Sequence, residues 1–139
     1  MVGILPKDTL TAITTLSEVD LAYNKISGSI PSSIYDSPIK ILKLHGNIDL
    51  GGIIFNDDFF KLSDTLEMID LENDDFEGEI PSEIKYFMNL RVLRLGCNRI
   101  SGTIPSEIGD LTNLGKQQGI FSSLLLSTYY LSQSRLFFL

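Results

Sequence analysis

The amino-acid sequence predicts an α/β solenoid, a coil in which a short strand and a short helical turn alternate along the chain. Two observations support this prediction. One pattern of about 24 residues recurs through most of the sequence, and its copies join a strand-like stretch of alternating apolar positions to a stretch that usually carries Gly and Pro. A single copy cannot bury its own apolar face, so the copies must stack on one another and share a core.

The first half of the clearest copy has strand character. Leu93 and Leu95 are two residues apart, so both point to one face of a short strand. Leu90, in the segment that leads into the strand, adds its side chain to theirs. Asn98 follows where the chain must turn, and its amide can both donate to and accept from backbone groups that the turn leaves unpaired. Gly102 permits a backbone conformation or a close approach that a side chain would block.

The second half of this copy has helical character. Pro105 lacks an N–H group, so it suits the first position of a short helical turn, and Glu107 lies near the positive end of that turn. Ile104, Ile108 and Leu111 return apolar side chains to the same interior. We therefore expect each copy to run from a strand through a turn into a short helix.

Four copies of the pattern occupy most of the chain. They begin at residues 16, 39, 66 and 90, and a fifth opens at 114, so the successive starts lie 23, 27, 24 and 24 residues apart. The second copy is looser, with Phe55 where Pro is expected and extra residues in its second half. The predicted division is a partial leading repeat (1–15), four repeats (16–38, 39–65, 66–89 and 90–113) and a non-repeat tail (115–139).

Over residues 3–114 this pattern resembles the leucine-rich-repeat family, in its plant-type form with a Gly-x-Ile-Pro signature. The resemblance implies a right-handed leucine-rich-repeat coil with a parallel sheet on the concave face and short helical or 3-10 turns on the convex side. It also implies short extra strands beside the Gly-x-Ile-Pro segment. The plant-type form is typical of the outer portions of receptor-like kinases and receptor-like proteins, and of secreted inhibitors of cell-wall-degrading enzymes.

Cysteine-bearing caps usually close both ends of solenoids in this family, and the sequence has a single cysteine, Cys97. Open ends would expose the apolar side chains of the terminal repeats, so solenoids need capping units. The pattern starts inside a repeat at Met1 and stops at Gly115. We therefore expect the chain to be a fragment of a longer protein.

The tail departs from the pattern, with Gln117 and Gly119 where apolar residues are expected. Three interpretations remain open: a hydrophobic cover for the last repeat, a membrane span, and a non-native extension from a translated intron or a shifted reading frame. A membrane span needs about 20 predominantly apolar residues. In the tail, 12 of the 20 residues from 120 to 139 are apolar.

The composition narrows the classes of partner. The net charge of −7 over 139 residues argues against nucleic acid or an anionic membrane, since both need a basic face. Any membrane contact would come through the tail or through segments missing from the chain. Residues 1–15 lack a charged start followed by an apolar block, so no secretory signal is visible. The cellular compartment stays open, although the resemblance points to the cell surface or plasma membrane.

The sequence shows no catalytic, cofactor-binding or metal-binding motif. His45 is the one histidine and falls on the exposed side of a strand, where an ordinary surface role is expected. Cys97 has no His or Cys partner at a ligand spacing. The acidic run from Glu67 to Glu83 lacks the pattern of a calcium loop and is interpreted as a solvated face. We therefore expect a protein that is not an enzyme and needs no cofactor.

The outward face of the predicted strands is the most informative surface. The residue between the two buried strand positions forms a column of alternating charge on strands about 4.8 Å apart. In successive copies this residue is Asp20, Lys43, Asp70 and Arg94. Three positions earlier the residues are Ser17, Lys40, Glu67 and Arg91. The predicted partner-binding residues of this concave face are Glu18, Asp20, Tyr23, Lys40, Lys43, His45, Glu67, Asp70, Glu72, Asn73, Arg91 and Arg94.

Two roles are open for these columns. They either set strand neighbours and solubility, since exposed ion pairs contribute only about 0–1 kcal/mol each, or they form a recognition surface for a protein or peptide, for which Tyr and Arg are usual anchors. The sequence favours a non-catalytic recognition module within a receptor-like surface protein. The alternatives are the ectodomain of a receptor kinase whose catalytic domain lies outside this chain, and a soluble intracellular scaffold.

Asp74 stands where the pattern has Asn. A carboxylate accepts hydrogen bonds but cannot donate them, so it cannot replace Asn fully at this turn. We predict that Asp74→Asn stabilises the solenoid.

Overall fold

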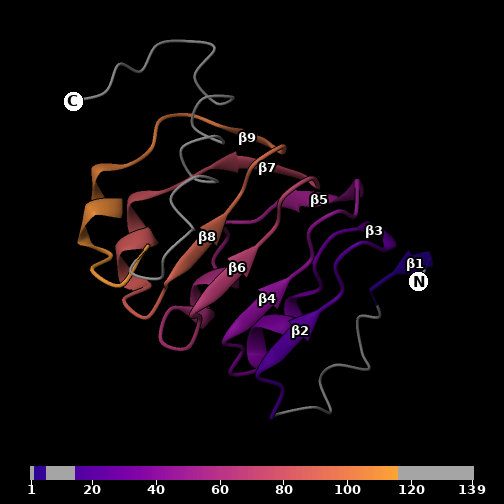
Figure 1. The fold of residues 1–139 in the computed structure, drawn as a ribbon, viewed down its shortest axis with the longest axis horizontal. Coiled ribbons are helices and arrows are strands. Elements are labelled where there is room, and N and C mark those ends of the chain that lie inside the picture. The colour runs from indigo at the N-terminus through magenta and orange to yellow at the C-terminus, as the bar shows by residue number, and fades with distance from the viewer. Residues whose placement is uncertain (1, 6–14, 116–139) are drawn as a thin grey trace.

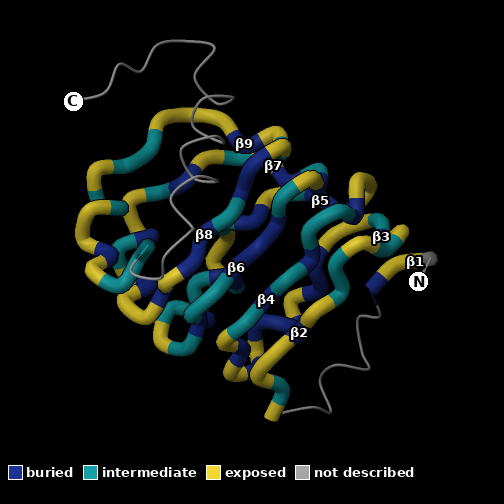
Figure 2. Tube along the Cα trace, viewed as in Figure 1, coloured by how far each residue is buried: buried dark blue, intermediate teal, exposed yellow. Residues whose placement is uncertain are grey.

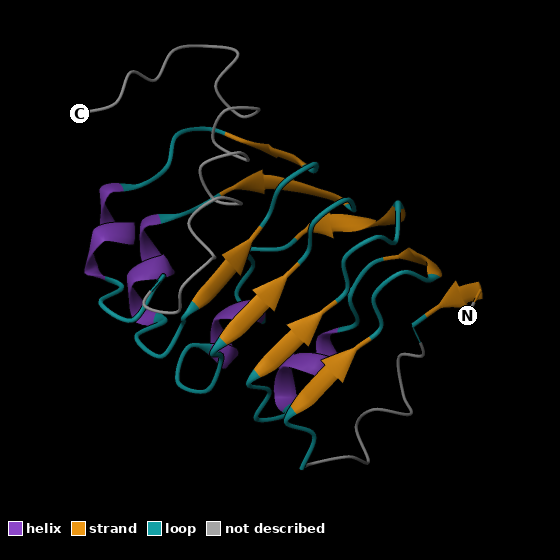
Figure 3. Ribbon diagram, in the orientation of Figure 1, coloured by secondary structure: helices purple, strands orange, loops and turns teal. Residues whose placement is uncertain are grey.

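The computed structural model describes residues 2–5 and 15–115, which form a solenoid of stacked coils (Figure 1). The complete coils each contribute one strand to each of two parallel sheets and one 3-10 helix (Figure 3). The strands of the first sheet, in the order β2-β4-β6-β8, are Glu18–Asp20, Ile41–Lys43, Met68–Asp70 and Val92–Arg94. The strands of the second sheet, in the order β1-β3-β5-β7-β9, are Val2–Ile4, Lys25–Gly28, Asp49–Ile53, Asp75–Glu79 and Arg99–Ser101. The 3-10 helices η1 to η4 are Ser32–Asp36, Phe59–Leu62, Ser82–Tyr86 and Ser106–Asp110.

These elements confirm the predicted fold class, with a parallel sheet of short strands, short helical turns and the additional strands beside the Gly-x-Ile-Pro segment. The predicted tail lies outside the described residues except for Gly115, and so do residues 6–14 of the leading repeat. In the part of the chain that the structure describes, no helix has the length and apolar character to cross a membrane.

The strands of the first sheet stack in register because each repeats the same alternation. Val19 is aligned with Leu42, Leu42 with Ile69, and Ile69 with Leu93. All four side chains are buried, whereas exposed residues lie both on the turns and on the outward positions of strands such as β2 (Figure 2). The alignment places apolar side chains of neighbouring coils together, so one core runs through the solenoid.

A group of aromatic rings joins the looser second copy to this core. The ring of Phe59, in η2, is fully buried, and its centroid lies 5.3 Å from that of Phe55, 5.1 Å from that of Phe87 and 6.0 Å from that of Tyr35. Phe55, which occupies the position of the missing Pro, therefore contributes apolar packing to its repeat.

Among the described residues, the three prolines of the Gly-x-Ile-Pro segments lie one position before the place that the sequence predicted. Pro31, Pro81 and Pro105 each directly precede a 3-10 helix and have extended backbone, with ψ of 141°, 165° and 143°. The expected first helical position was therefore wrong by one residue. The carbonyl oxygen of each proline accepts the first hydrogen bond of its helix, from the N–H groups of Ile34, Ile84 and Ile108.

An asparagine ladder closes the turns that follow the first sheet, as predicted. The side-chain nitrogen of Asn98 donates to the carbonyl oxygens of Leu71 and Leu95, and its side-chain oxygen accepts from the N–H of Phe76 at 2.9 Å. Asn47 makes the equivalent contacts with its own and the preceding coil. Each amide thus connects two coils through groups that the turn leaves unpaired.

A second ladder, not expected from the sequence, lies before the first-sheet strands. Asn89 donates to the carbonyl oxygen of Asp64 at 2.7 Å, and Asn113 donates to that of Met88 at 2.8 Å. The hydroxyl of Thr65 makes a similar contact with the preceding coil at 2.9 Å. Side-chain hydrogen bonds between coils therefore lie at both ends of the first-sheet strands.

Candidate recognition surface

The predicted column of alternating charge crosses the first sheet in strand register. Asp20 is aligned with Lys43, Lys43 with Asp70, and Asp70 with Arg94. Because side chains alternate across a strand, this column points away from the buried core residues. The predicted column of alternating charge is therefore present, and the ion pairs among the described residues divide it into two groups.

The first group lies at the β2 edge of the sheet. The ammonium group of Lys43 is 3.2 Å from a carboxylate oxygen of Asp20 and 3.6 Å from one of Glu18. Asp20 also accepts a hydrogen bond from the N–H of Ala22, and this bond together with Lys43 lowers the pKa of the Asp20 carboxyl. Asp20 in turn raises the pKa of Lys43. These side chains are solvent-exposed, so their pairing orients them more than it stabilises the fold.

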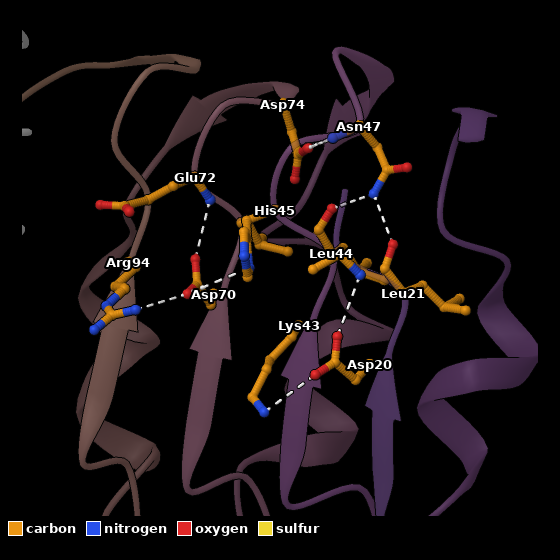
Figure 4. Close-up of polar contacts among 12 residues, drawn as sticks. Asp20, Leu21, Lys43, Leu44, His45, Asn47, Asp70, Glu72, Asp74 and Arg94 are labelled. Carbon is orange, nitrogen blue, oxygen red and sulfur yellow. Dashed lines mark hydrogen bonds and ion pairs between the residues drawn. The ribbon is translucent and has the colours of Figure 1, made fainter. Parts of the chain in front are cut away.

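The second group is centred on Asp70, which is buried although the sequence predicted an exposed, partner-contacting residue (Figure 4). Its Oδ2 accepts from Nη1 of Arg94 at 2.9 Å and lies 3.4 Å from Nδ1 of His45, and its Oδ1 accepts from the N–H of Glu72 at 3.3 Å. Asp70 has a short side chain, and the longer side chains of its neighbours lie on either side of it. It therefore holds the guanidinium group of Arg94 by a hydrogen bond and lies close to the His45 ring.

The second predicted column forms a third charged group. Glu67 lies 3.6 Å from the ammonium group of Lys40 and 3.7 Å from the guanidinium of Arg91, on the neighbouring strands. The predicted alternation over these three residues is confirmed. Their side chains remain substantially exposed, so the group is available at the surface.

His45 has more contacts than the ordinary surface position that the sequence suggested. Its side chain is only 19% exposed. Its ring packs edge-on against the ring of Tyr23, with centroids 4.8 Å apart and an angle of 87° between the planes. Tyr23 itself is 81% exposed. The two rings form an aromatic corner at the end of β2 and β4.

The last two predicted residues, Glu72 and Asn73, follow β6 at the same end of the sheet. Sequence reasoning missed Ile41 and Met68, which are aligned with Glu18 and are half-buried. They place an apolar strip among the charged columns. The signal was present in the sequence, because both directly precede a buried strand position and so must point outward.

Asp74 occupies the asparagine position of the ladder, and like Asp70 it is buried, so the acidic run is not the uniformly solvated face that the sequence suggested. Its Oδ1 accepts from the N–H of Asn47 at 2.7 Å (Figure 4). Within residues 2–5 and 15–115, no donor reaches its buried Oδ2. Burial and, to a lesser extent, the charge of Asp70 raise the pKa of Asp74 to about 7, although the hydrogen bond from Asn47 lowers it.

The surface offers hydrogen bonds, charges and aromatic contacts to a ligand. Among the described residues, no three His, Cys, Asp or Glu side chains are grouped so that they could hold a metal ion. Cys97 is a free, exposed thiol at the end of β8.

Comparison with known proteins identifies relatives of this chain. The family model of the Leucine Rich Repeat matches residues 15–37 and 89–111. Receptor-like protein 34 of Arabidopsis thaliana is 40% identical over 112 residues, which cover 81% of this chain and 9% of that protein. Receptor-like protein 35 of the same plant is 38% identical over 107 residues, which cover 76% of this chain and 11% of that protein. The chain thus spans only about a tenth of the length of these two relatives.

Solved structures agree with this assignment. The ectodomain of the Arabidopsis receptor kinase HAESA, solved in complex with an N-terminal extended IDA peptide hormone ligand, superposes with a TM-score of 0.73 and 33% sequence identity. The match covers 81% of this chain and 18% of that one. The repeat signature, the two parallel sheets and the relatives lead to one conclusion. The chain belongs to the leucine-rich-repeat family, in its plant-type form.

Proposed function

We propose that this chain is a non-catalytic recognition module whose first sheet binds a protein or an extended peptide. The observation that carries the proposal is the set of charged side chains on this sheet, arranged in strand register and joined by ion pairs from one coil to the next. The receptor-like names of the relatives and the peptide bound to the HAESA ectodomain support a role in reception at the cell surface.

The ion pairs favour recognition by pattern over attraction by net charge. Lys43, Glu67 and Asp70 each contact side chains of opposite charge in neighbouring coils. The charges on the first sheet therefore largely cancel. Such pairs hold the side chains in fixed places before a ligand arrives, which reduces the entropy lost on binding. A ligand with complementary groups at matching intervals would be selected over one that is merely charged.

The predicted division of the chain is part of the proposal. The strands of the first sheet begin at residues 18, 41, 68 and 92, each two residues after the start of a predicted repeat at 16, 39, 66 and 90. This constant offset supports four structural units over 16–113, with a partial unit before them and a separate tail at 115–139.

The proposal can be tested with the full chain and a random 12-residue peptide library displayed on phage. We expect the library to yield binders whose affinity falls about tenfold or more in the Arg91→Glu variant, because reversing a charge in a recognition surface places like charges together. Arg99→Glu is the matched control. Arg99 lies on the second sheet, is similarly exposed (61% against 54%), and likewise pairs with a carboxylate, that of Asp75.

Two results would contradict the proposal. One is a library that yields no binder, and the other is a set of binders that Arg99→Glu weakens as much as Arg91→Glu does. Circular dichroism of both variants establishes that each retains the fold, so that a loss of binding is assigned to the surface.

A second candidate is the ectodomain of a receptor kinase. The similarity to the ectodomain of HAESA, which is a receptor kinase, favours it. Sequencing the transcript beyond this chain separates the two: a downstream kinase glycine-rich loop and catalytic loop would favour the receptor kinase, and a transcript without them would favour the receptor-like protein.

A further inference from the structure

The residue directly before the ladder position has a left-handed backbone in all four repeats. These residues, here called the rim, are Tyr23, Gly46, Asn73 and Cys97, with φ of 52°, 78°, 57° and 55°. Glycine takes this conformation freely and asparagine is enriched in it, whereas a bulky side chain is unfavourable there. A tyrosine at the rim is therefore strained by the position that the repeat imposes on it.

Tyr23 is held in place by three contacts with the next coil. Its N–H donates to the carbonyl oxygen of His45 at 2.8 Å, and its ring packs edge-on against the His45 ring. The ring also lies across Gly46, where an added Cβ would be 2.8 Å from Cδ1 of the tyrosine. Gly46 thus leaves room for the ring. Although it is fixed in this way, Tyr23 remains 81% exposed, so a rigid aromatic ring is presented to solvent at the edge of the recognition surface.

The ion pairs of the strand that leads to this ring leave a net negative charge, because two carboxylates face one ammonium group. Glu18 and Asp20, on the strand that leads to Tyr23, share the single ammonium group of Lys43. An anionic ligand group would be repelled by these carboxylates, whereas a cation would be attracted by them and by the negative face of the ring.

We propose that Tyr23 is the aromatic anchor of the recognition surface and that its ring takes an arginine or lysine side chain of a peptide ligand. This inference rests on the proposed function and adds to it the chemistry of one contact. Strained residues persist where the surrounding structure fixes them, and they concentrate at functional sites. Tyrosine suits this role because it supplies a large contact area with few rotatable bonds.

The test uses a peptide selected on the full chain and four variants. Tyr23→Asn removes the ring and supplies a residue that suits the left-handed backbone, as Asn73 does. Tyr23→Phe keeps the ring. Gly46→Ala displaces the ring without removing it. Tyr86→Asn, at an exposed tyrosine of η3, is the matched control.

We expect Tyr23→Asn and Gly46→Ala to weaken peptide binding about three- to tenfold, while Tyr23→Phe and Tyr86→Asn leave it within about twofold. Replacing the cationic residue of the peptide with neutral citrulline or norleucine should cause the same loss with the wild-type chain and no further loss with Tyr23→Asn. This shared loss assigns the cation to the ring.

The outcomes separate this inference from the function on which it rests. Binding that Arg91→Glu weakens and Tyr23→Asn leaves unchanged would overturn the role of Tyr23 and keep the recognition surface. The role of Tyr23 would also be overturned if the neutral peptide loses affinity for Tyr23→Asn as much as it does for the wild-type chain, so that the two losses add. A library that yields no peptide would overturn both proposals.

Discussion

At the scale of single residues, the asparagine ladder shows how one substitution changes the energetics of a repeat. Asn47 and Asn98 each donate to carbonyl oxygens that directly follow two neighbouring strands of the first sheet. Asp74 occupies the same place between them and has no donor when it is ionised, and its buried Oδ2 has no partner among the described residues. A buried acceptor left unpaired destabilises a fold by about 1–3 kcal/mol.

Replacing Asp74 with Asn should therefore raise the free energy of unfolding by about 1–3 kcal/mol. The new amide would donate where the carboxylate cannot, and the side-chain oxygen would keep the hydrogen bond from Asn47. Thermal and urea unfolding followed by circular dichroism measure the change. Asn98→Asp is the matched control and should shift stability in the opposite direction. An unchanged or lower melting temperature for Asp74→Asn would refute this explanation.

The same carboxyl makes stability depend on pH. Its pKa in the fold is about 7, against an ordinary value of 3.8, so between these values the folded chain holds a proton that the unfolded chain has released. Folding is therefore favoured by protonation, and this contribution is fully present below about pH 4 and is lost as pH rises through about 7. Unfolding in urea at pH 4 to 8 should show Asp74→Asn gaining most over the wild type above pH 7. A gain that is constant across this range would count against the raised pKa.

At the scale of elements, contacts between neighbouring strands of the second sheet decide which glycines cannot be replaced. Gly52, which has φ of 103°, occupies the recurring glycine position of the second repeat, whereas Gly51 beside it does not. In the structure, a Cβ on Gly51 would lie 2.1 Å from the carbonyl oxygen of Asp75 on β7. A periodic pattern identifies positions that recur in every coil, whereas this contact arises only where the irregular repeat meets its neighbour.

Gly51→Ala should lower the free energy of unfolding by about 1–3 kcal/mol or more, because β5 and β7 must separate to admit the methyl group. Gly109→Ala is the matched control, since a Cβ there would meet no atom within 4 Å, and it should leave stability unchanged or slightly higher. Urea unfolding of both variants tests the prediction. Equal stability of the two variants would show that the strands adjust without strain.

The sequence was sufficient for the elements and insufficient for the contacts within the candidate site. Recurring Leu, Asn and Gly positions predicted the strands, the ladder and the turns because each has one physical role in every coil. The burial of Asp70 depends on His45 and Arg94, which come from two other coils. Likewise, the contact between Tyr23 and His45 depends on a small residue at position 46. The sequence pattern describes the residues of one coil, so it does not show which side chains from three neighbouring strands reach one another.

At the scale of the whole molecule, the solenoid turns a one-dimensional repeat into a surface. Stacking fixes the spacing of the strands, and register fixes which side chains share a column. Ion pairs between coils then hold these side chains in place. The first sheet is in this way a patterned face, and we propose that a ligand binds there.

Chemical-shift mapping by NMR tests this claim most directly. The isotope-labelled chain would be titrated with a peptide selected from the library, and the perturbed residues located on the structure. We expect the largest shifts on the first sheet and the rim, including Tyr23, His45 and Arg91. Shifts concentrated on the second sheet around Arg99, or on the 3-10 helices, would contradict it.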